Sequence, residues 1–235
     1  MSEHVRVERS DEGVLAITLA RPDRRNAITV AMYAALAEAI EAAARDRSLR
    51  LITIRGEGRD FTAGNDLNDF LKALPRDSED IPVWRLLRAL ARNEIPLIAA
   101  VQGNAVGIGT TMLLHCDLVI AEDSARFSLP FVDLGLVPEA ASSLLLPRLT
   151  GRRLAARYLL LAEPFGASEA HAAGIVSHVV AAGELETALR AGQQFPLIIR
   201  HHQVALDATG IGSAGQQSGA HQCGHRFAIG ALRLR

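Results

Sequence analysis

Cysteine is scarce in this chain of 235 residues, whose two thiols are Cys116 and Cys223. Two thiols do not make a disulfide scaffold or a four-ligand zinc site, and we expect a reducing compartment. Long apolar runs are also missing, because no stretch reaches the roughly 18 uninterrupted apolar residues of a membrane span. We therefore expect a cytoplasmic protein with no membrane partner.

An excess of charge of either sign is also absent. The 25 basic and 26 acidic side chains leave a net charge of -1, which provides no overall field to attract nucleic acid. An anionic ligand would have to be bound by basic groups at a local site. With 49% hydrophobic and 22% charged residues, the chain is able to bury a sizeable core in one domain, which excludes the disordered and collagen-like classes.

Short apolar runs of strand length alternate with helical patterns in the first half of the chain, which predicts an α/β fold. Residues 5–8 and 14–19 are predicted to form a hairpin. The other predicted strands are 51–54, 96–101 and 117–121, and the predicted helices are 30–45 behind a Thr29 cap, 66–74, 81–92 and 110–115. From 138 to 180 the pattern is mainly helical, with Gly151 and Gly174 at helix ends and Ser168 as a cap.

The chain divides into a core of residues 1–190 and an atypical tail of residues 191–235. Residues 201–235 contain four of the eight histidines, six glycines and a single acid, Asp207, without sustained helical or strand periodicity. The pairs His201–His202 and His221/His225 have donor atoms for a metal ion. Because they lie in this irregular tail, we predict no metal site.

Two glycine-containing segments share a physical signature. Gly64-Asn65-Asp66 and Gly107-Ile-Gly109 each come directly before or at the start of a predicted helix, where backbone N–H groups lack partners and attract negative charge. Either segment alone could simply be a tight turn, but together they can form an oxyanion hole. A dinucleotide fingerprint is excluded because Met112 occupies the position of its third glycine, and no phosphate loop exists because Lys72 is the only lysine.

Five motifs follow one another along the chain. They are Arg21-Pro-Asp-Arg-Arg-Asn26-Ala27-Ile28, Phe61-Thr-Ala-Gly64-Asn65-Asp66-Leu67, Ile98-Ala-Ala-Val-Gln-Gly103-Asn-Ala-Val-Gly107-Ile-Gly109, Cys116-Asp117-Leu-Val-Ile-Ala121 and Ala170-His-Ala-Ala-Gly174-Ile-Val. Together they resemble the crotonase, or enoyl-CoA hydratase/isomerase, superfamily, with the motifs closest to Δ3,Δ2-enoyl-CoA isomerases. The resemblance covers residues 5 to about 190. It implies a crotonase-like spiral of ββα repeats whose C-terminal helical region is aberrant or truncated in this chain.

The resemblance also implies an acyl-CoA thioester as substrate, with its carbonyl oxygen held by the backbone amides of Asn65 and Ile108. No separate cofactor is implied, since coenzyme A is part of the substrate. The family's assembly is a homotrimer or hexamer, and the atypical tail puts those contacts in question. The residues implied in CoA binding are Arg24, Arg25, Ala27, Ala63, Gly64, Asp66, Leu67, Asn68 and Gly107.

The acid–base residue decides the reaction. Hydratases that this chain resembles use two glutamates, and the matching positions hold Thr111 and Phe131. Glu139 instead follows the Leu-Gly-x-x-x-Glu spacing of the isomerases, so it is the implied catalytic carboxylate. Leu136, Val137 and residues 144–146 are expected to surround it and raise its pKa. Without the resemblance, Glu139 would be a glutamate in the first turn of a helix, complementing the helix dipole.

The predicted activity is therefore isomerisation of 3-enoyl-CoA to 2-enoyl-CoA by a single glutamate, through a dienolate held in the oxyanion hole. Two alternatives stay open: a hydratase or other crotonase-type reaction that uses Glu139 alone, and a catalytically silent acyl-CoA-binding module. Asp133 is a weaker candidate acid, which would share a face with Phe131 only if that stretch were a strand. His115 is a single histidine without metal-ligand spacing.

Overall fold

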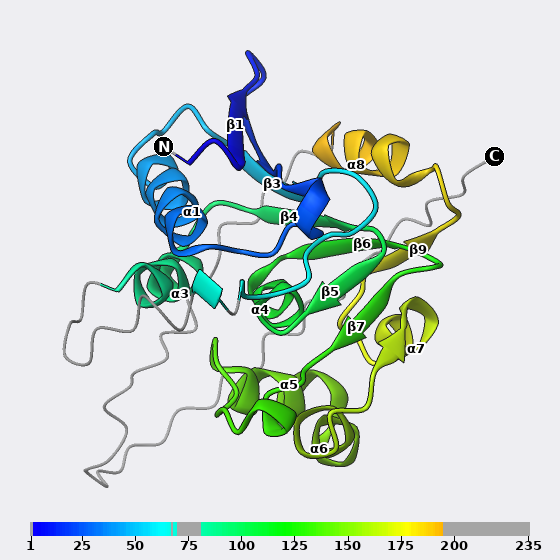
Figure 1. Ribbon diagram of the computed structural model, residues 1–235. Coiled ribbons are helices and arrows are strands. Elements are labelled where there is room, and N and C mark those ends of the chain that lie inside the picture. Colours follow the sequence, from blue (N-terminus) through cyan, green and yellow to red (C-terminus); the bar gives the residue numbers. More distant parts are fainter. Residues whose placement is uncertain (1, 67, 70–80, 195–235) are drawn as a thin grey trace, which may run out of the picture. The chain divides into compact units, whose positions relative to one another are not determined.

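The computed structural model describes residues 2–66, 68–69 and 81–194 of the chain (Figure 1). Its larger sheet has the strand order β1-β2-β3-β4-β6-β9, and a smaller sheet has the order β5-β7-β8. The strands are β1 (Val5–Arg9), β2 (Val14–Leu19), β3 (Leu51–Gly56), β4 (Leu97–Val101), β5 (Asn104–Val106), β6 (Leu118–Glu122), β7 (Arg126–Ser128), β8 (Phe165–Gly166) and β9 (His178–Val180). From β2 to β9 the larger sheet is parallel, while β1 and β2 form the predicted antiparallel hairpin.

The helices lie between these strands. They are α1 (Val30–Ala43), α3 (Pro82–Arg92), α4 (Ile108–Thr111), α5 (Ser142–Thr150), α6 (Arg152–Leu160), α7 (Ala167–Ala172) and α8 (Leu185–Gln194), with 3₁₀ turns η1 (Pro22–Arg24), η2 (Met112–His115) and η3 (Val132–Leu134). Helix α1 packs on α3, and α8 packs on β4 and β6 (Figure 1). None of the described helices combines the length and the apolar character needed to cross a membrane.

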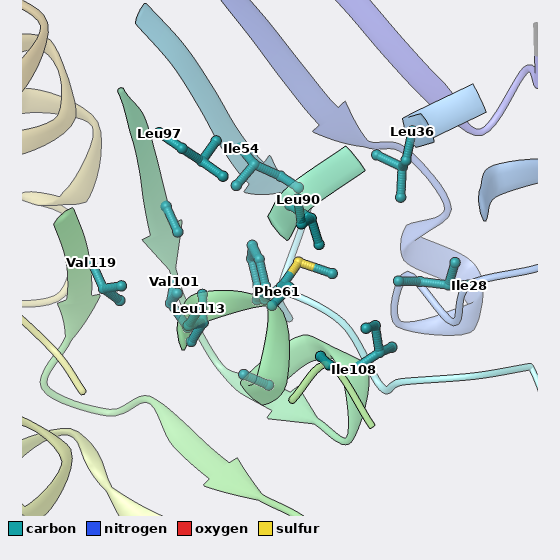
Figure 2. Close-up of a cluster of buried hydrophobic side chains, with 14 of the residues drawn as sticks. Ile28, Leu36, Ile54, Phe61, Leu90, Leu97, Val101, Ile108, Leu113 and Val119 are labelled. Carbon is teal, nitrogen blue, oxygen red and sulfur yellow. The ribbon is translucent and has the colours of Figure 1, made fainter. Parts of the chain in front are cut away.

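The larger sheet separates two hydrophobic layers. Strand β4 is fully buried, and alternate residues of a strand point to opposite faces. Ile98 and Ala100 pack with Leu189 of α8, whereas Leu97, Ala99 and Val101 belong to the main core. Figure 2 shows part of the main core, with side chains from α1, α3, the central strands and η2. Ile28, Phe61 and Ile108 of the sequence motifs belong to this core, which therefore supports the segments that carry the motifs.

The α/β class is confirmed, and so is the Thr29 cap, whose Oγ1 accepts a hydrogen bond from the Met32 N–H at 3.2 Å. The mainly helical assignment of 138–180 was too simple, because β8 and β9 lie within that stretch. Strands of two or three residues are too short to produce a detectable alternation. Ser168 is not a cap, since α7 begins one residue before it and Gly166 occupies the N-cap position.

Parts of two predictions lie outside the described residues. Most of the helix predicted over 66–74 lies outside the described residues. The tail predicted from residue 191 is described only to residue 194, where α8 ends.

Backbone pairing brings three of the five motifs together. Residues 62–66 lie between the first motif and the third, because isolated parallel bridges join Ile28 to Asn65 and Thr62 to Ala105. The three segments therefore lie side by side and pair through their backbones as in a small parallel sheet. This arrangement depends on buried hydrogen bonds of the first motif.

Asn26 makes the central hydrogen bonds of that motif. Its side chain is completely buried, and its Nδ2 donates to the carbonyl oxygens of Glu57 at 2.9 Å and Asp60 at 2.8 Å. Its Oδ1 accepts from the Arg21 N–H at 2.8 Å. The backbone of Asn26 has a φ of 55°, which asparagine tolerates better than most residues. One side chain thus closes the turn between η1 and the segment that precedes the site.

Replacing Asn26 with alanine should lower the free energy of unfolding by about 3 kcal/mol, because one buried and two partly buried backbone groups lose their partner. Urea denaturation measures this change. Asn26→Gly loses the same hydrogen bonds but adopts a positive φ without strain, so it should be about 1 kcal/mol more stable than Asn26→Ala. An alanine variant as stable as the wild type would contradict this account of the turn.

Candidate active site

A cavity of about 200 Å³ opens where three segments of the chain meet. It is bounded by the second motif, the start of α4 and the loop that runs from β7 to α5. Its lining residues are Ala63, Gly64, Asn65, Val106, Gly107, Ile108, Pro130, Phe131, Leu134, Leu136 and Glu139. Three other hollows of the described surface, of about 230 to 410 Å³, contain none of the predicted site residues.

Asn65 and Ile108, the two predicted oxyanion residues, both line this cavity. Neither backbone N–H donates a hydrogen bond to any group in the described part of the chain. The Ile108 side chain is 1% exposed and lies in the main core, so only its backbone is left for the cavity (Figure 2). The structure therefore brings two unpaired amide donors to one small cavity.

A glycine is required beside Asn65. Gly64 has a φ of +86°, and a Cβ on it would lie 2.8 Å from the carbonyl oxygen of Val106. Any other side chain would push the second motif away from β5. Gly64 thus permits the close approach of the second motif to β5, two residues before Ile108.

Glu139, the predicted catalytic carboxylate, lines the same cavity. Its Oε1 is buried and has no hydrogen-bond partner among the described residues. Burial raises the pKa of Glu139 to about 7, in the predicted direction. Among the described residues that line the cavity, Glu139 is the only one with a titratable side chain.

The apolar surroundings of Glu139 differ from those expected. Phe131, Leu134 and Leu136 line the cavity with it. Leu134 and Leu136 are themselves partly exposed, whereas Val137, which is 85% exposed, and Leu144 do not line the cavity, so the expectation that these two shield the carboxyl was wrong. The turn of η3 and the residues that flank it supply the apolar wall that we expected from the sequence neighbours of Glu139.

The two positions that carry glutamate in hydratases hold no carboxylate here. Thr111 is buried, and its Oγ1 donates to the Ile108 carbonyl oxygen at 3.5 Å. Phe131 is 6% exposed and fills its side of the cavity. Asp133 is exposed on η3. Because this stretch is a 3₁₀ turn and not a strand, Asp133 does not share a face with Phe131 as strand alternation would require.

The predicted CoA-binding residues fall into two groups. Ala63, Gly64 and Gly107 line the cavity. Arg24 and Arg25 are exposed on and beside η1, and the Ala63 N–H donates to the Arg25 carbonyl oxygen at 2.9 Å. The two arginines therefore lie on a turn that is hydrogen-bonded to the cavity wall.

The remaining residues of the second motif have different environments. The Asp66 carboxylate pairs with Arg21 at 2.8 Å, and this hydrogen bond lowers the pKa of Asp66. Arg21 also donates to the carbonyl oxygen of Ala27 at 3.0 Å. Asn68 is exposed, and Leu67 lies outside the described residues. Asp66 thus ties the first motif to the second through its side chain.

Sequence reasoning missed Arg21 and Tyr33 as supports of the site. The Tyr33 hydroxyl, on α1, donates to the side-chain oxygen of Asn65. Burial raises the pKa of Tyr33, and the charge of Glu139 raises it further. The Arg-Pro motif was a signal for Arg21. For Tyr33 there was none, because the helical pattern predicts only that its face of α1 is buried.

No group of three or more histidine, cysteine or acidic side chains in the described residues is arranged to hold a metal ion. The histidine pairs of the tail lie outside those residues. Cys116 is a free thiol whose pKa is raised by burial, and Asp117 accepts a hydrogen bond from the Leu97 N–H at 2.8 Å. The hydrogen bond of Asp117 thus ties the residue before β6 to the first residue of the neighbouring strand β4.

Comparisons with known proteins agree with this geometry. Residues 9–209 match the protein family described as Enoyl-CoA hydratase/isomerase. The chain is 38% identical to 2,3-dehydroadipyl-CoA hydratase of Escherichia coli K12 over 90% of its own length and 82% of the relative. It is 40% identical to 1,2-epoxyphenylacetyl-CoA isomerase of the same organism, over 72% and 67%. An enoyl-CoA hydratase/isomerase structure from Pseudoalteromonas atlantica T6c aligns with a TM-score of 0.79 at 40% identity, over 84% and 78%.

The buried carboxyl of Glu139 should make stability depend on pH. Its pKa is about 7 in the folded chain against an ordinary 4.5, so its favourable contribution is complete below pH 4.5 and is lost as pH rises through 7. Between pH 5 and pH 8 the free energy of unfolding of the wild type should fall by about 2 kcal/mol more than that of Glu139→Gln, which has no carboxyl to ionise at this position. Urea denaturation of both proteins at the two pH values measures this difference. Asp133→Asn, which removes an exposed carboxyl of η3, should track the wild type, and a pH-independent gap for Glu139→Gln would contradict the burial of this group.

Proposed function

The chain belongs to the enoyl-CoA hydratase/isomerase family, and we propose that it converts 3-enoyl-CoA to 2-enoyl-CoA with Glu139 as its single acid–base group. One observation carries the proposal. The unpartnered carboxyl oxygen of Glu139 shares a small cavity with the unpaired amides of Asn65 and Ile108. This cavity has one proton-transfer group and two donors for a developing negative charge.

The proposed reaction moves one proton between two carbons. The Glu139 carboxylate removes a proton from C2 of the 3-enoyl thioester, and the electron pair of that C–H bond forms a dienolate with its negative charge on the thioester oxygen. The protonated Glu139 then returns the proton to C4. The double bond shifts from C3–C4 to C2–C3, and the carboxylate is regenerated. No separate cofactor takes part in this cycle.

The electrostatics of the cavity suit both halves of the cycle. A carboxyl with a pKa of about 7 is a stronger base than an ordinary glutamate and is still about half ionised at neutral pH. The amides of Asn65 and Ile108 would donate to the dienolate oxygen, and one such donor is typically worth about 10²- to 10³-fold in rate. The apolar wall at Phe131, which is 6% exposed, strengthens these interactions because it limits the access of water on that side of the cavity.

Binding of the CoA part is assigned to the turn of η1 and the second motif. Arg25 is exposed and has no ion pair within the described residues, and Arg24 makes only a long, exposed contact of 3.9 Å with Asp23. Both guanidinium groups are thus available for phosphate oxygens. They would supply locally the positive charge that the chain lacks overall.

A hydratase is the second candidate, because one of the relatives is a hydratase and the alignment with it covers 90% of this chain. Hydration requires that a water molecule be activated and that the α-carbon be protonated. The pair of positions that would share this work holds Thr111 and Phe131, so Glu139 would have to do both. The absence of a second carboxylate among the described cavity residues favours the isomerase.

Incubation with 3-hexenoyl-CoA and with crotonyl-CoA distinguishes the candidates. We expect double-bond migration in 3-hexenoyl-CoA and little hydration of crotonyl-CoA. Glu139→Gln should lower kcat about 10³- to 10⁴-fold, the upper part of the range for a general acid–base group, because no second group replaces it. Calorimetric binding of the thioester should stay within about threefold of the wild type.

Asp133→Asn is the matched control, since it removes a nearby carboxylate from the exposed side of η3. Its kcat should stay within about twofold of the wild type. A Glu139→Gln variant that retains activity within tenfold would disprove the single-glutamate mechanism. Rapid hydration of crotonyl-CoA would favour the second candidate, and binding without turnover of either thioester would identify a silent acyl-CoA-binding module.

A further inference from the structure

We infer that His115 is a positioning residue for Glu139: its imidazole holds the peptide carbonyl of Ala140 and thereby fixes the direction of the catalytic carboxylate. This inference rests on the proposed function, because it gives Glu139 the role of the acid–base group. It assigns a function to a histidine that has no metal-ligand spacing and does not line the cavity.

The backbone directly after Glu139 is unusual. Ala140 and Ala141 both have left-handed conformations, with φ values of 54° and 53°. Residues with a Cβ rarely adopt this conformation, and two in succession are unfavourable unless surrounding groups hold them. The turn therefore depends on hydrogen bonds to its peptide groups.

Two side chains provide these hydrogen bonds. Ser142 donates to the Glu139 carbonyl oxygen through its Oγ at 2.6 Å and through its backbone N–H at 2.9 Å. The Nε2 of His115 lies 2.9 Å from the Ala140 carbonyl oxygen. Ser142 is local to the turn, at the first position of α5. His115 is 25 residues away in sequence, so it anchors the turn to another part of the fold.

The position of His115 links the two halves of the site. Helix α4 begins at Ile108, whose amide is the proposed oxyanion donor, and runs without a break into η2, which ends at His115. The same helical segment thus presents an amide at one end and holds the Glu139 turn at the other. A fixed distance between the donor and the carboxylate is what a proton transfer beside an oxyanion hole requires.

The protonation state of His115 suits this contact. Because a carbonyl oxygen only accepts hydrogen bonds, Nε2 must carry the hydrogen. His115 is half-buried, and this burial lowers its pKa, so the neutral ring is favoured near pH 7. The uncharged imidazole donates one hydrogen bond without placing a positive charge behind Glu139.

The chain contains a matched histidine away from the cavity. The Nδ1 of His171, at the end of α7, lies 3.0 Å from the carbonyl oxygen of Val176. Like His115, it holds a backbone carbonyl of a turn that follows in sequence, but the neighbours of Val176 in the chain do not line the cavity, whereas Ala140 directly follows Glu139, which does. His171→Leu therefore reports what the loss of such a hydrogen bond does to the fold alone.

The test compares His115→Leu, His115→Gln and His171→Leu in the isomerisation of 3-hexenoyl-CoA. His115→Leu should lower kcat about 10- to 100-fold and leave KM within about threefold, because the carboxylate is misplaced while thioester binding is kept. His115→Gln, whose side-chain amide can still donate to the Ala140 carbonyl, should recover kcat to within about threefold of the wild type. His171→Leu should lower Tm without changing kcat.

Amide hydrogen exchange tests the same contact without turnover. The Ser142 N–H, which donates to the Glu139 carbonyl oxygen, should exchange at least about tenfold faster in His115→Leu and at the wild-type rate in His171→Leu. Unchanged Ser142 exchange would overturn the inference, even if the wild type showed no isomerase activity. A His115→Leu variant with wild-type kcat, or a His115→Gln variant as slow as His115→Leu, would also overturn it.

Glu139→Gln, assayed in parallel, separates this failure from a failure of the proposed function. If Glu139→Gln is inactive and His115→Leu is fully active, the proposed function survives and His115 has no positioning role. If Glu139→Gln retains the wild-type rate, the single-glutamate mechanism is wrong, and the catalytic role of His115 falls with it.

Discussion

Backbone hydrogen bonds on both sides of residues 62–66 hold the site together. This segment pairs with Ile28 on one side and with Ala105 on the other, so three motifs far apart in sequence become neighbours. Gly64 permits the close approach, since a Cβ there would lie 2.8 Å from the Val106 carbonyl oxygen. The pairing with Ile28 uses the Gly64 carbonyl oxygen and the Asp66 N–H, so the Asn65 N–H between them has no partner in the described chain. The Ile108 N–H has none there because Ile108 is the first residue of α4.

The second constraint is the cost of keeping Glu139 where it is. A carboxyl oxygen without a hydrogen-bond partner, beside Phe131 and Leu136, is unfavourable for the fold once it ionises. The left-handed turn at Ala140 and Ala141 is a further strain. Both features are typical of positions where activity, and not stability, determines the structure. The same burial that destabilises the charged carboxyl makes it a stronger base.

Much of the fold and the composition of the site could be predicted from the sequence. The hairpin, α1 with its Thr29 cap and the buried strands follow from local periodicity. Asn65, Ile108 and Glu139 do line one cavity, as the motifs imply. Short strands such as β8 lack a periodic signal. The N-cap predicted at Ser168 lies two residues beyond the observed one, because Gly166 can also cap a helix.

The supporting contacts could not be predicted, because each joins residues far apart in the chain. Tyr33 contacts Asn65 across 32 residues, and His115 contacts Ala140 across 25. No local pattern distinguishes these two side chains from ordinary buried ones. The exposure of Val137 was missed for the same reason: it depends on the path of the chain after η3, which places the partly exposed Leu134 and Leu136 along the cavity and leaves Val137 outside it.

The central claim is that a buried Glu139 with a raised pKa is the base of an isomerase. The most direct test is the pH dependence of kcat/KM for isomerisation of 3-hexenoyl-CoA, which reports the ionisation of the free enzyme. Because the carboxylate is the active form, kcat/KM should rise as pH increases through about 7 and reach a plateau above it. A rate that is flat between pH 5 and pH 8.5, or that breaks near the ordinary glutamate pKa of 4.5, would contradict the claim.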